Sequence, residues 1–199
     1  MTKTELFALY ERSYVHEVEV RDKINSRLQT PMTIIVALIG VIAFLMQNYE
    51  IESFKMAADH VMFLFFLSVS AIALVLAVYY FIRSWWNNPY WFLPAPVETA
   101  NYRRELEETY AGYDNADELV DRYSGEYVEQ KYIEYASWNA KVNDNRSAYL
   151  HRCNAVIVLA VVMLFVAFLI FYFSGFDKTR VRKAQEVYIE RPVPVRVVK

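Results

Sequence analysis

The sequence has few of the residues that build disulfides, tight loops or catalytic motifs. Its 199 residues include 4 glycines and a single cysteine, Cys153. So few glycines argue against glycine-rich phosphate loops and strand-and-turn architectures, and one cysteine excludes an internal disulfide. The 3 histidines lie far apart, and no HExxH, CxxC or GxSxG pattern occurs. We therefore expect a protein that is not an enzyme and that needs no metal or cofactor.

Charge is absent from three long apolar runs, at residues 31–47, 61–82 and 155–173. The second and third runs are 22 and 19 residues long, enough for a helix to cross about 30 Å of hydrocarbon. Buried helices of a soluble bundle would normally keep a polar face instead. The sequence therefore predicts an all-α integral membrane protein with three transmembrane helices. Because the N-terminus is polar, we expect no cleavable signal peptide.

The chain divides into six parts by composition. We expect an N-terminal amphipathic helix at 1–30, a two-span hairpin at 31–83, an aromatic interfacial segment at 84–96, a cytoplasmic helical domain at 97–152, a third span at 153–175 and a basic tail at 176–199. Proline favours a helix start over a helix interior, so Pro31 predicts a break between the first helix and the first span. The pattern leaves open whether the first helix lies on lipid or packs on the soluble domain.

Positive charge flanks the first two spans on one side. The basic flanking residues are Arg21, Lys23, Arg27 and Arg83, whereas the connection at 48–60 is acidic. The positive-inside preference then predicts a multi-pass membrane protein with a cytoplasmic N-terminus and with this connection outside. Three spans would leave the basic tail outside, against that preference. We favour three spans because the first helix usually sets the orientation; the alternative is that 84–96 dips into the membrane.

Aromatic side chains crowd the segment between the second span and the cytoplasmic domain. We expect them to form a belt at the headgroup layer, where amphipathic rings are favoured; contact with a neighbouring subunit is the alternative. The belt residues are Trp85, Trp86, Tyr90 and Trp91.

No proline or other terminator occurs between 116 and 173. We therefore expect one helix over this range, about 85 Å long, that begins in water and ends in lipid. Two adjacent stripes repeat along it every seven residues, which indicates a helix-packing seam. One stripe holds Val128, Tyr135, Val142, Tyr149, Val156, Met163 and Ile170; the other holds Tyr132, Asn139, Arg146, Cys153, Ala160, Ala167 and Ser174.

Two interpretations of the second stripe stay open. Small residues allow close helix approach in lipid, either within one subunit or at a subunit seam that lines a pore. The candidate pore or seam residues are Cys153, Ala160, Ala167 and Ser174, with Ser68 and Ser70 on the second span. Asn139 and Arg146 would then lie at an inner vestibule.

The cytoplasmic segment is rich in tyrosine and basic residues. The tyrosines are expected to form the core of a small helical domain; the alternative is a stacking platform for a nucleobase. The candidate ligand contacts are Arg103, Arg104, Arg122 and Lys131.

The order of spans, together with the stretch ASWNAKVNDNRSAYLHRCNAV that enters the third span, resembles the small membrane effectors of prokaryotic antiviral defence, including SLATT-type and channel-forming proteins. A third span departs from the two-span type. The resemblance implies a homo-oligomeric channel, with a tetramer favoured, that opens the inner membrane when a nucleotide or oligonucleotide signal or a soluble defence partner reaches its cytoplasmic part. The alternative is a non-conducting sensor or scaffold that recruits a soluble partner.

Overall fold

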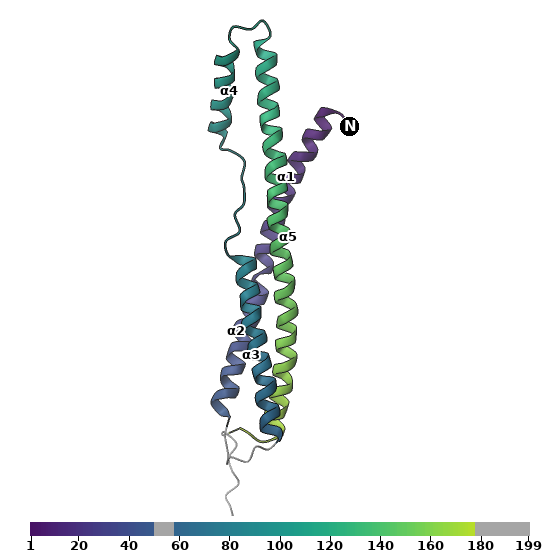
Figure 1. Cartoon of the computed structure of the whole chain (residues 1–199), viewed down its shortest axis with the longest axis vertical. Helices are drawn as coiled ribbons and strands as arrows, with labels where there is room; N and C mark the ends of the chain where they lie inside the picture. The colour runs from purple at the N-terminus through teal and green to yellow at the C-terminus, as the bar shows by residue number, and fades with distance from the viewer. Residues whose placement is uncertain (50–57, 178–199) are drawn as a thin grey trace, which may run out of the picture.

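The computed structural model describes residues 1–49 and 58–177, and within these ranges the chain is helical apart from its connections. The helices are α1 (Lys3–Arg27), α2 (Gln29–Asn48), α3 (Ala58–Trp85), α4 (Pro96–Tyr110) and α5 (Ala116–Phe173). Figure 1 shows an elongated molecule in which α5 runs almost from end to end. Most of the predicted acidic connection and of the basic tail lies outside the described residues.

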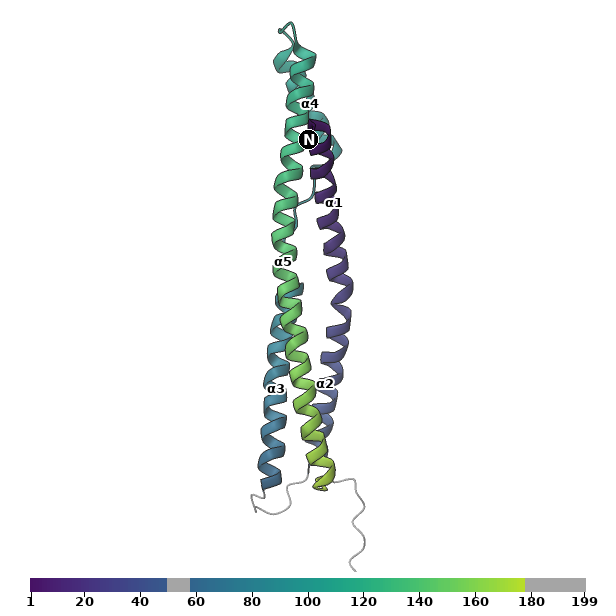
Figure 2. The same cartoon turned by 90° about the vertical axis from the view of Figure 1, so that its right-hand side faces the viewer.

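The predicted spans lie side by side at one end of the molecule. Three helical stretches are long and apolar enough to cross a membrane, which confirms the expectation of an all-helical chain with three candidate spans. We call α2, α3 and residues 153–173 of α5 the span bundle. The stalk consists of α1, α4 and residues 116–152 of α5; it extends from one end of the bundle (Figures 1 and 2).

The predicted break before the first span is only a one-residue junction. Leu28 alone separates α1 from α2, and it keeps helical backbone angles. The Leu28 N–H donates to Ile24 O at 3.2 Å, and the Met32 N–H donates to Leu28 O at 3.3 Å. Pro31 falls in the first turn of α2, where a missing N–H costs little. The predicted break is therefore present only as a one-residue turn at Leu28, three residues before Pro31, and it does not interrupt the path of the chain.

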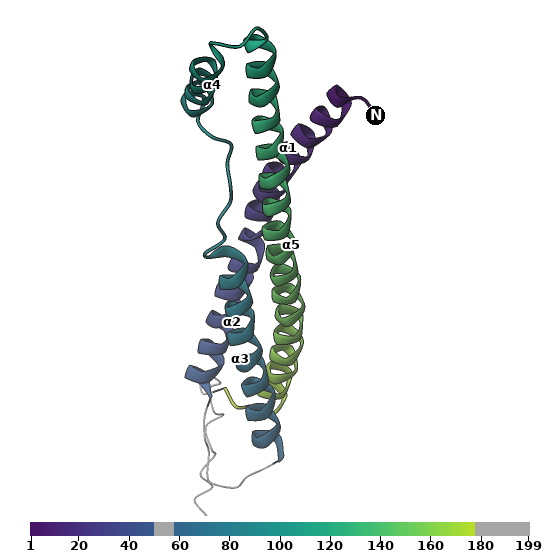
Figure 3. The ribbon, with the colours of Figure 1, turned by 45° about the horizontal axis from the view of Figure 1, so that its top comes forward.

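The first helix packs on the soluble part of the protein. Tyr14 and Ile24 of α1 are buried, and the Phe7 and Tyr14 rings contact Tyr132 of α5 edge-on at 5.5 and 5.7 Å between centroids. These contacts favour the second of the two placements that the sequence left open, a helix held against α5. Figure 3 shows α1 and α4 approaching α5 from different directions.

The long helix forms without interruption, as its composition predicts. α5 contains 58 residues, which corresponds to a length of about 87 Å. Its end is set by Gly175, whose φ of 70° is a left-handed conformation that favours glycine. The Phe176 N–H donates to Phe171 O at 3.2 Å, a common way to satisfy the last carbonyls of a helix.

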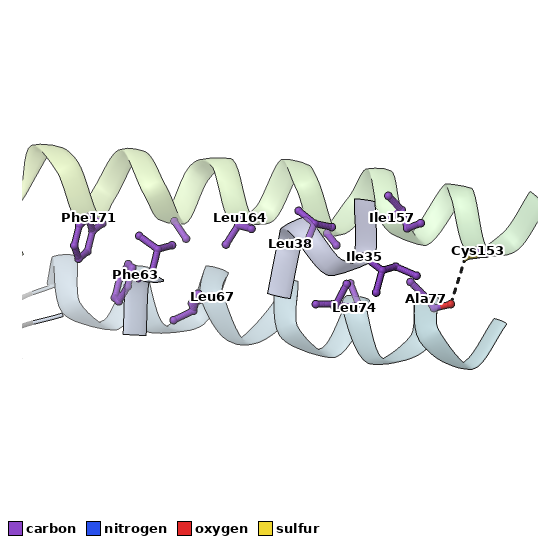
Figure 4. Close-up of a cluster of buried hydrophobic side chains, with 14 of the residues drawn as sticks. Ile35, Leu38, Phe63, Leu67, Leu74, Ala77, Cys153, Ile157, Leu164 and Phe171 are labelled. Carbon is purple, nitrogen blue, oxygen red and sulfur yellow. Dashed lines mark hydrogen bonds between the residues drawn. The ribbon is translucent and has the colours of Figure 1, made fainter. Parts of the chain in front are cut away.

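The span bundle is held together mainly by α3 against α5. Cys153, Ala160 and Ala167 are fully buried, and larger side chains such as Phe63 and Leu164 fill the space between them (Figure 4). Because small residues let backbones approach, polar groups of one helix reach the backbone of the other. The Ser70 hydroxyl donates to Ala160 O at 2.9 Å, and Cys153 Sγ lies 3.4 Å from Ala77 O.

The aromatic segment after α3 does not turn back into the bundle. Residues 86–95 run along α5 toward α4 (Figure 1). The Trp91 ring stacks on Trp138 at 4.7 Å between centroids, and Trp138 Nε1 donates to Pro89 O at 2.9 Å. The segment therefore does not return toward the bundle, as a dip into the membrane would require. The number of candidate spans stays at three.

Candidate functional site

A groove of about 710 Å³ opens in the stalk between α4, α5 and the start of α1. We call it the stalk groove. Its walls are mostly rings and prolines contributed by all three helices and by the segment that precedes α4. These wall residues are Phe7, Pro94, Pro96, Tyr102, Tyr127 and Tyr132. A concave, largely apolar surface with a few polar groups is typical of a ligand or peptide site.

Ring contacts between tyrosines set the distance between α4 and α5 beside the groove. The Tyr102 ring of α4 lies against Tyr127 of α5 at 4.3 Å between centroids. Further along, Tyr110 stacks on Tyr123 at 5.6 Å. α4 has no buried residue of its own, so these pairs fix its distance from α5. The tyrosines therefore serve both as the packing of a small domain and as the groove wall.

Two cations border the groove. Arg103 donates to Asp121 at 2.8 Å and to Glu107 at 3.2 Å, and Asp121 and then Glu107 raise the pKa of the guanidinium. Burial lowers the pKa of the Lys131 ammonium, but Tyr135 and Glu134 more than offset this effect and raise the pKa overall. Both side chains are therefore positively charged at neutral pH.

Of the four predicted ligand contacts, the structure brings Arg103 and Lys131 to one groove. Arg122 lines an adjoining cleft with Lys3 and pairs with Glu126 at 3.0 Å. Arg104 is exposed on α4 and donates to Asn101 at 3.2 Å. The predicted set of four therefore separates into a pair at the groove and two peripheral cations.

Ser124 also lines the groove, although nothing in the sequence singles it out. Within residues 1–49 and 58–177, its Oγ is the buried side-chain oxygen or nitrogen that has no hydrogen-bond partner. Leaving such an atom unpaired costs about 1–3 kcal/mol, so it is a candidate contact for a ligand. A single serine between Tyr123 and Gly125 forms no sequence motif. Its position beside the groove is known only once α4 is placed against α5.

Asn139 and Arg146 were predicted to line an inner vestibule, but both are buried inside one chain. Asn139 exchanges two hydrogen bonds of 2.9 Å with the backbone of Trp91. Arg146 donates to Ser84 O at 2.8 Å, to Tyr90 Oη at 2.7 Å and to Asn25 Oδ1 at 2.7 Å. The two residues therefore tie α1, the end of α3 and the aromatic segment to α5, and the vestibule assignment is corrected.

A third residue of this group, Asn143, was not singled out from the sequence. It is 2% exposed, accepts from Tyr90 Oη at 2.6 Å and donates to Glu17 O at 2.8 Å. We call Asn139, Asn143 and Arg146 the junction cluster. Its position explains why α5 turns polar where it leaves the bundle: these side chains satisfy the irregular backbone packed beside it.

The proposed seam residues are used within the chain. Cys153, Ala160 and Ala167 are 0% exposed and Ser70 is 1% exposed, all between α3 and α5. This placement matches the interpretation of packing within one subunit and leaves these four no free surface for a second copy. Ser174 lies at the end of α5, where its hydroxyl donates to Asp59 at 3.4 Å. Ser68 alone of the set is exposed on a span.

The four belt residues also separate into two pairs. Trp85 and Trp86, at the end of α3, are 57% and 67% exposed, as expected for rings at a membrane interface. Tyr90 and Trp91 instead turn onto α5 through the junction cluster and Trp138. In the part of the chain that the structure describes, no group of three or more histidine, cysteine or acidic side chains gathers as a metal site would.

Comparisons with protein-family models, with curated proteins and with solved structures find no match to this chain.

Proposed function

We propose that this chain is a multi-pass membrane receptor that takes up a ligand or a soluble partner in its stalk groove. One observation carries the proposal: a single helix, α5, forms a wall of the groove and is also the central helix of the span bundle. A displacement at the groove is therefore transmitted to the membrane without crossing a flexible connection. This is the sensor or scaffold class of function that the sequence offered as an alternative.

The groove chemistry supports an anionic ligand with a flat ring. Tyr102, Tyr127 and Tyr132 line the groove with aromatic surface. Lys131 supplies positive charge beside the ion pair that Arg103 makes with Asp121, which also lines the groove. Base–aromatic stacking contributes about 1–3 kcal/mol per base, and a phosphate gains charge-assisted hydrogen bonds from such cations. A nucleotide or short oligonucleotide combines both features.

Orientation of the protein follows from the charges that flank the spans. Arg21, Lys23 and Arg27 belong to α1, and Arg83 belongs to the last turn of α3, so all four lie at the stalk end of the bundle. By the positive-inside preference this side is cytoplasmic, so the groove would face the cytoplasm of a cell with this protein in its inner membrane.

Binding to the groove can be tested on the purified full-length chain in detergent. A panel of mononucleotides and short oligonucleotides is titrated and the complexes are counted by native mass spectrometry. Lys131→Gln is expected to weaken binding about tenfold, since it removes one charge-assisted hydrogen bond. Arg104→Gln is the matched control, because Arg104 is a stalk cation outside the groove. Equal affinity of both variants and the parent would contradict the proposal.

The second candidate is the homo-oligomeric channel of prokaryotic antiviral defence. The open face of α2 favours it, because Ala37 is exposed and a side chain placed at Gly40 would meet nothing within 4 Å. Such a small-residue face allows a second helix to approach in lipid. A pore would then lie between copies, with the tetramer that the resemblance favours. Its wall would be apolar, which is compatible with gating by dewetting.

Ion flux separates the two candidates. The purified chain is reconstituted into liposomes loaded with a fluorescent ion indicator, with and without a ligand found in the binding screen. Ligand-dependent flux that Gly40→Leu abolishes, with assembly followed by native mass spectrometry, would establish the channel. Binding without flux would establish the receptor class. The defence setting rests on the resemblance of the span order and of the stretch that enters the third span, and neighbouring genes are its direct test.

A further inference from the structure

A second cleft, of about 340 Å³, lies between the α1–α2 junction and α5. We call it the interfacial cleft. Its polar lining comes from both sides: Arg27 and Thr30 at the junction, and Ser147, His151 and Asn154 on α5. Within the lining, no carboxylate accompanies these groups. The cleft is therefore a concave cluster of hydrogen-bond donors with net positive charge.

The cleft lies at the boundary between water and hydrocarbon. Its two helices enter their apolar runs here, α2 at Pro31 and α5 just beyond Cys153. In a bilayer, the polar headgroup layer occupies this depth on each side of about 30 Å of hydrocarbon. The cleft is also lined by the apolar side chains of Ile24, Pro31 and Leu150. A ligand held here would therefore meet both hydrogen-bond donors and apolar surface.

The donors of the cleft are free. Across residues 1–49 and 58–177, the five polar lining side chains make no hydrogen bond or ion pair with the protein. By contrast, Arg103 and Arg122 in the stalk are each ion-paired, and the buried Arg146 makes three hydrogen bonds. Polar groups that converge without using each other remain available to an outside acceptor.

The walls of the cleft are fixed. Ile24, Leu28 and Leu150 form a small buried cluster that joins the α1–α2 junction to α5, with exposures of 3%, 5% and 7%. The donors therefore sit on helices whose spacing is set by apolar packing, so a ligand would not need to order them from separate loops. Such preorganisation lowers the entropic cost of binding.

We propose that the interfacial cleft binds the phosphate of an anionic phospholipid. Arg27 supplies the charge, and Thr30, Ser147 and Asn154 supply neutral donors to the phosphate oxygens. The glycerol packs on the apolar side chains of Pro31 and Leu150, which lie among these donors. A soluble phosphate compound offers the same acceptors but no acyl chains to enter the hydrocarbon beside the cleft. The proposal goes beyond the proposed function, because this cleft shares no residue with the stalk groove.

The test is a titration of the delipidated full-length chain in detergent micelles, with the lipid complexes counted by native mass spectrometry. The ligands are a phosphatidylglycerol, a phosphatidylcholine with the same acyl chains, and soluble glycerol phosphate. We expect saturable one-to-one binding of phosphatidylglycerol at least about tenfold tighter than of the other two. Arg27→Gln is expected to reduce this affinity about tenfold, the effect of losing one charged hydrogen bond.

A second substitution and a control separate the site from diffuse attraction. Thr30→Val keeps the side-chain shape and is expected to weaken phosphatidylglycerol binding about threefold. Arg83→Gln removes a cation at a similar depth on α3, where Arg83 lies over the Tyr149 ring at 5.2 Å, and should leave binding unchanged. Equal losses in Arg27→Gln and Arg83→Gln would overturn the proposal, as would equal affinity for phosphatidylcholine or for glycerol phosphate. We expect each variant to keep the helical circular dichroism spectrum of the parent, because Arg27 and Thr30 are both exposed.

Discussion

The span bundle and the stalk share one helix but are built in opposite ways. In the bundle, α5 presents fully buried small residues such as Ala160 to α3, and the two backbones lie close enough for Ser70 to reach across. In the stalk, the same helix presents rings to α4, and the two helices are joined by tyrosine pairs and by the exposed Arg103–Asp121 ion pair. The bundle is a packed support, whereas the stalk leaves a groove that a ligand can fill.

The largest loss of stability is expected when a large aromatic ring is inserted into the span bundle. Ala160→Trp places an indole where the Ser70 hydroxyl meets the α5 backbone, and such overpacking should lower the free energy of unfolding by more than about 3 kcal/mol. Thermal unfolding in detergent measures the loss. Val161→Trp is the control, because Val161 is 42% exposed toward lipid. If both variants unfolded like the parent, Ala160 would not lie in the α3–α5 contact.

The next largest effect is expected at the boundary between the two regions. Arg146→Met leaves the acceptors Ser84 O, Tyr90 Oη and Asn25 Oδ1 without their donor, which should cost about 2 kcal/mol. Limited proteolysis should then cut residues 86–95 sooner than in the parent. Arg152→Met, which removes an exposed cation from the next turns of α5, should leave the cleavage rate unchanged. Equal protection in both variants would show that Arg146 does not hold the segment.

Within the stalk, the ring pairs should matter less than bundle packing. Tyr127→Leu removes the partner of Tyr102, and an aromatic pair contributes about 1 kcal/mol beyond its buried area. Amide hydrogen exchange in α4 is expected to quicken about fivefold as a result, while α3 amides stay protected. Tyr79→Leu is the control, because Tyr79 is 53% exposed on α3, which lies in the span bundle apart from α4 (Figure 1). Unchanged exchange in α4 would mean that other contacts position it.

The smallest effect is expected for a surface ion pair. Arg122→Gln breaks the pair with Glu126, but exposed i,i+4 pairs contribute little because water and salt screen them. The midpoint of thermal unfolding should not shift measurably at a physiological salt concentration of about 150 mM. A clear drop in the midpoint would show that the stalk depends on surface charge more than on its rings.

Much of the backbone structure was predictable from the sequence, because residues that would interrupt a span or a helix are missing from long stretches of it. The missing charges mark the spans, and the missing proline between Gly112 and Pro192 predicts that α5 is unbroken. Pro31 predicted a break that is present only as a one-residue turn. Proline ends a helix that precedes it in many contexts, but here it occupies the first turn of α2, and Leu28 keeps helical angles.

The partners of these elements were not predictable in the same way. A seven-residue repeat shows that a helix face is packed, but not against which helix, so Cys153, Ala160 and Ala167 fitted a subunit seam as well as contact with α3. Asn139 and Arg146 stood out as polar residues, yet the hydrogen-bond partners of their side chains lie 48 or more positions away. Ser124 carried no signal, because its burial depends on where α4 returns.

The central claim is that α5 is one rigid helix from the stalk groove into the membrane. A double electron–electron resonance measurement tests it directly, with spin labels at Gln130→Cys and Val161→Cys in a Cys153→Ala background; both label positions are exposed. A continuous helix predicts one narrow distance distribution, with the two backbones about 46 Å apart. A broad distribution, or a main distance shorter by more than about two helical turns, would contradict it.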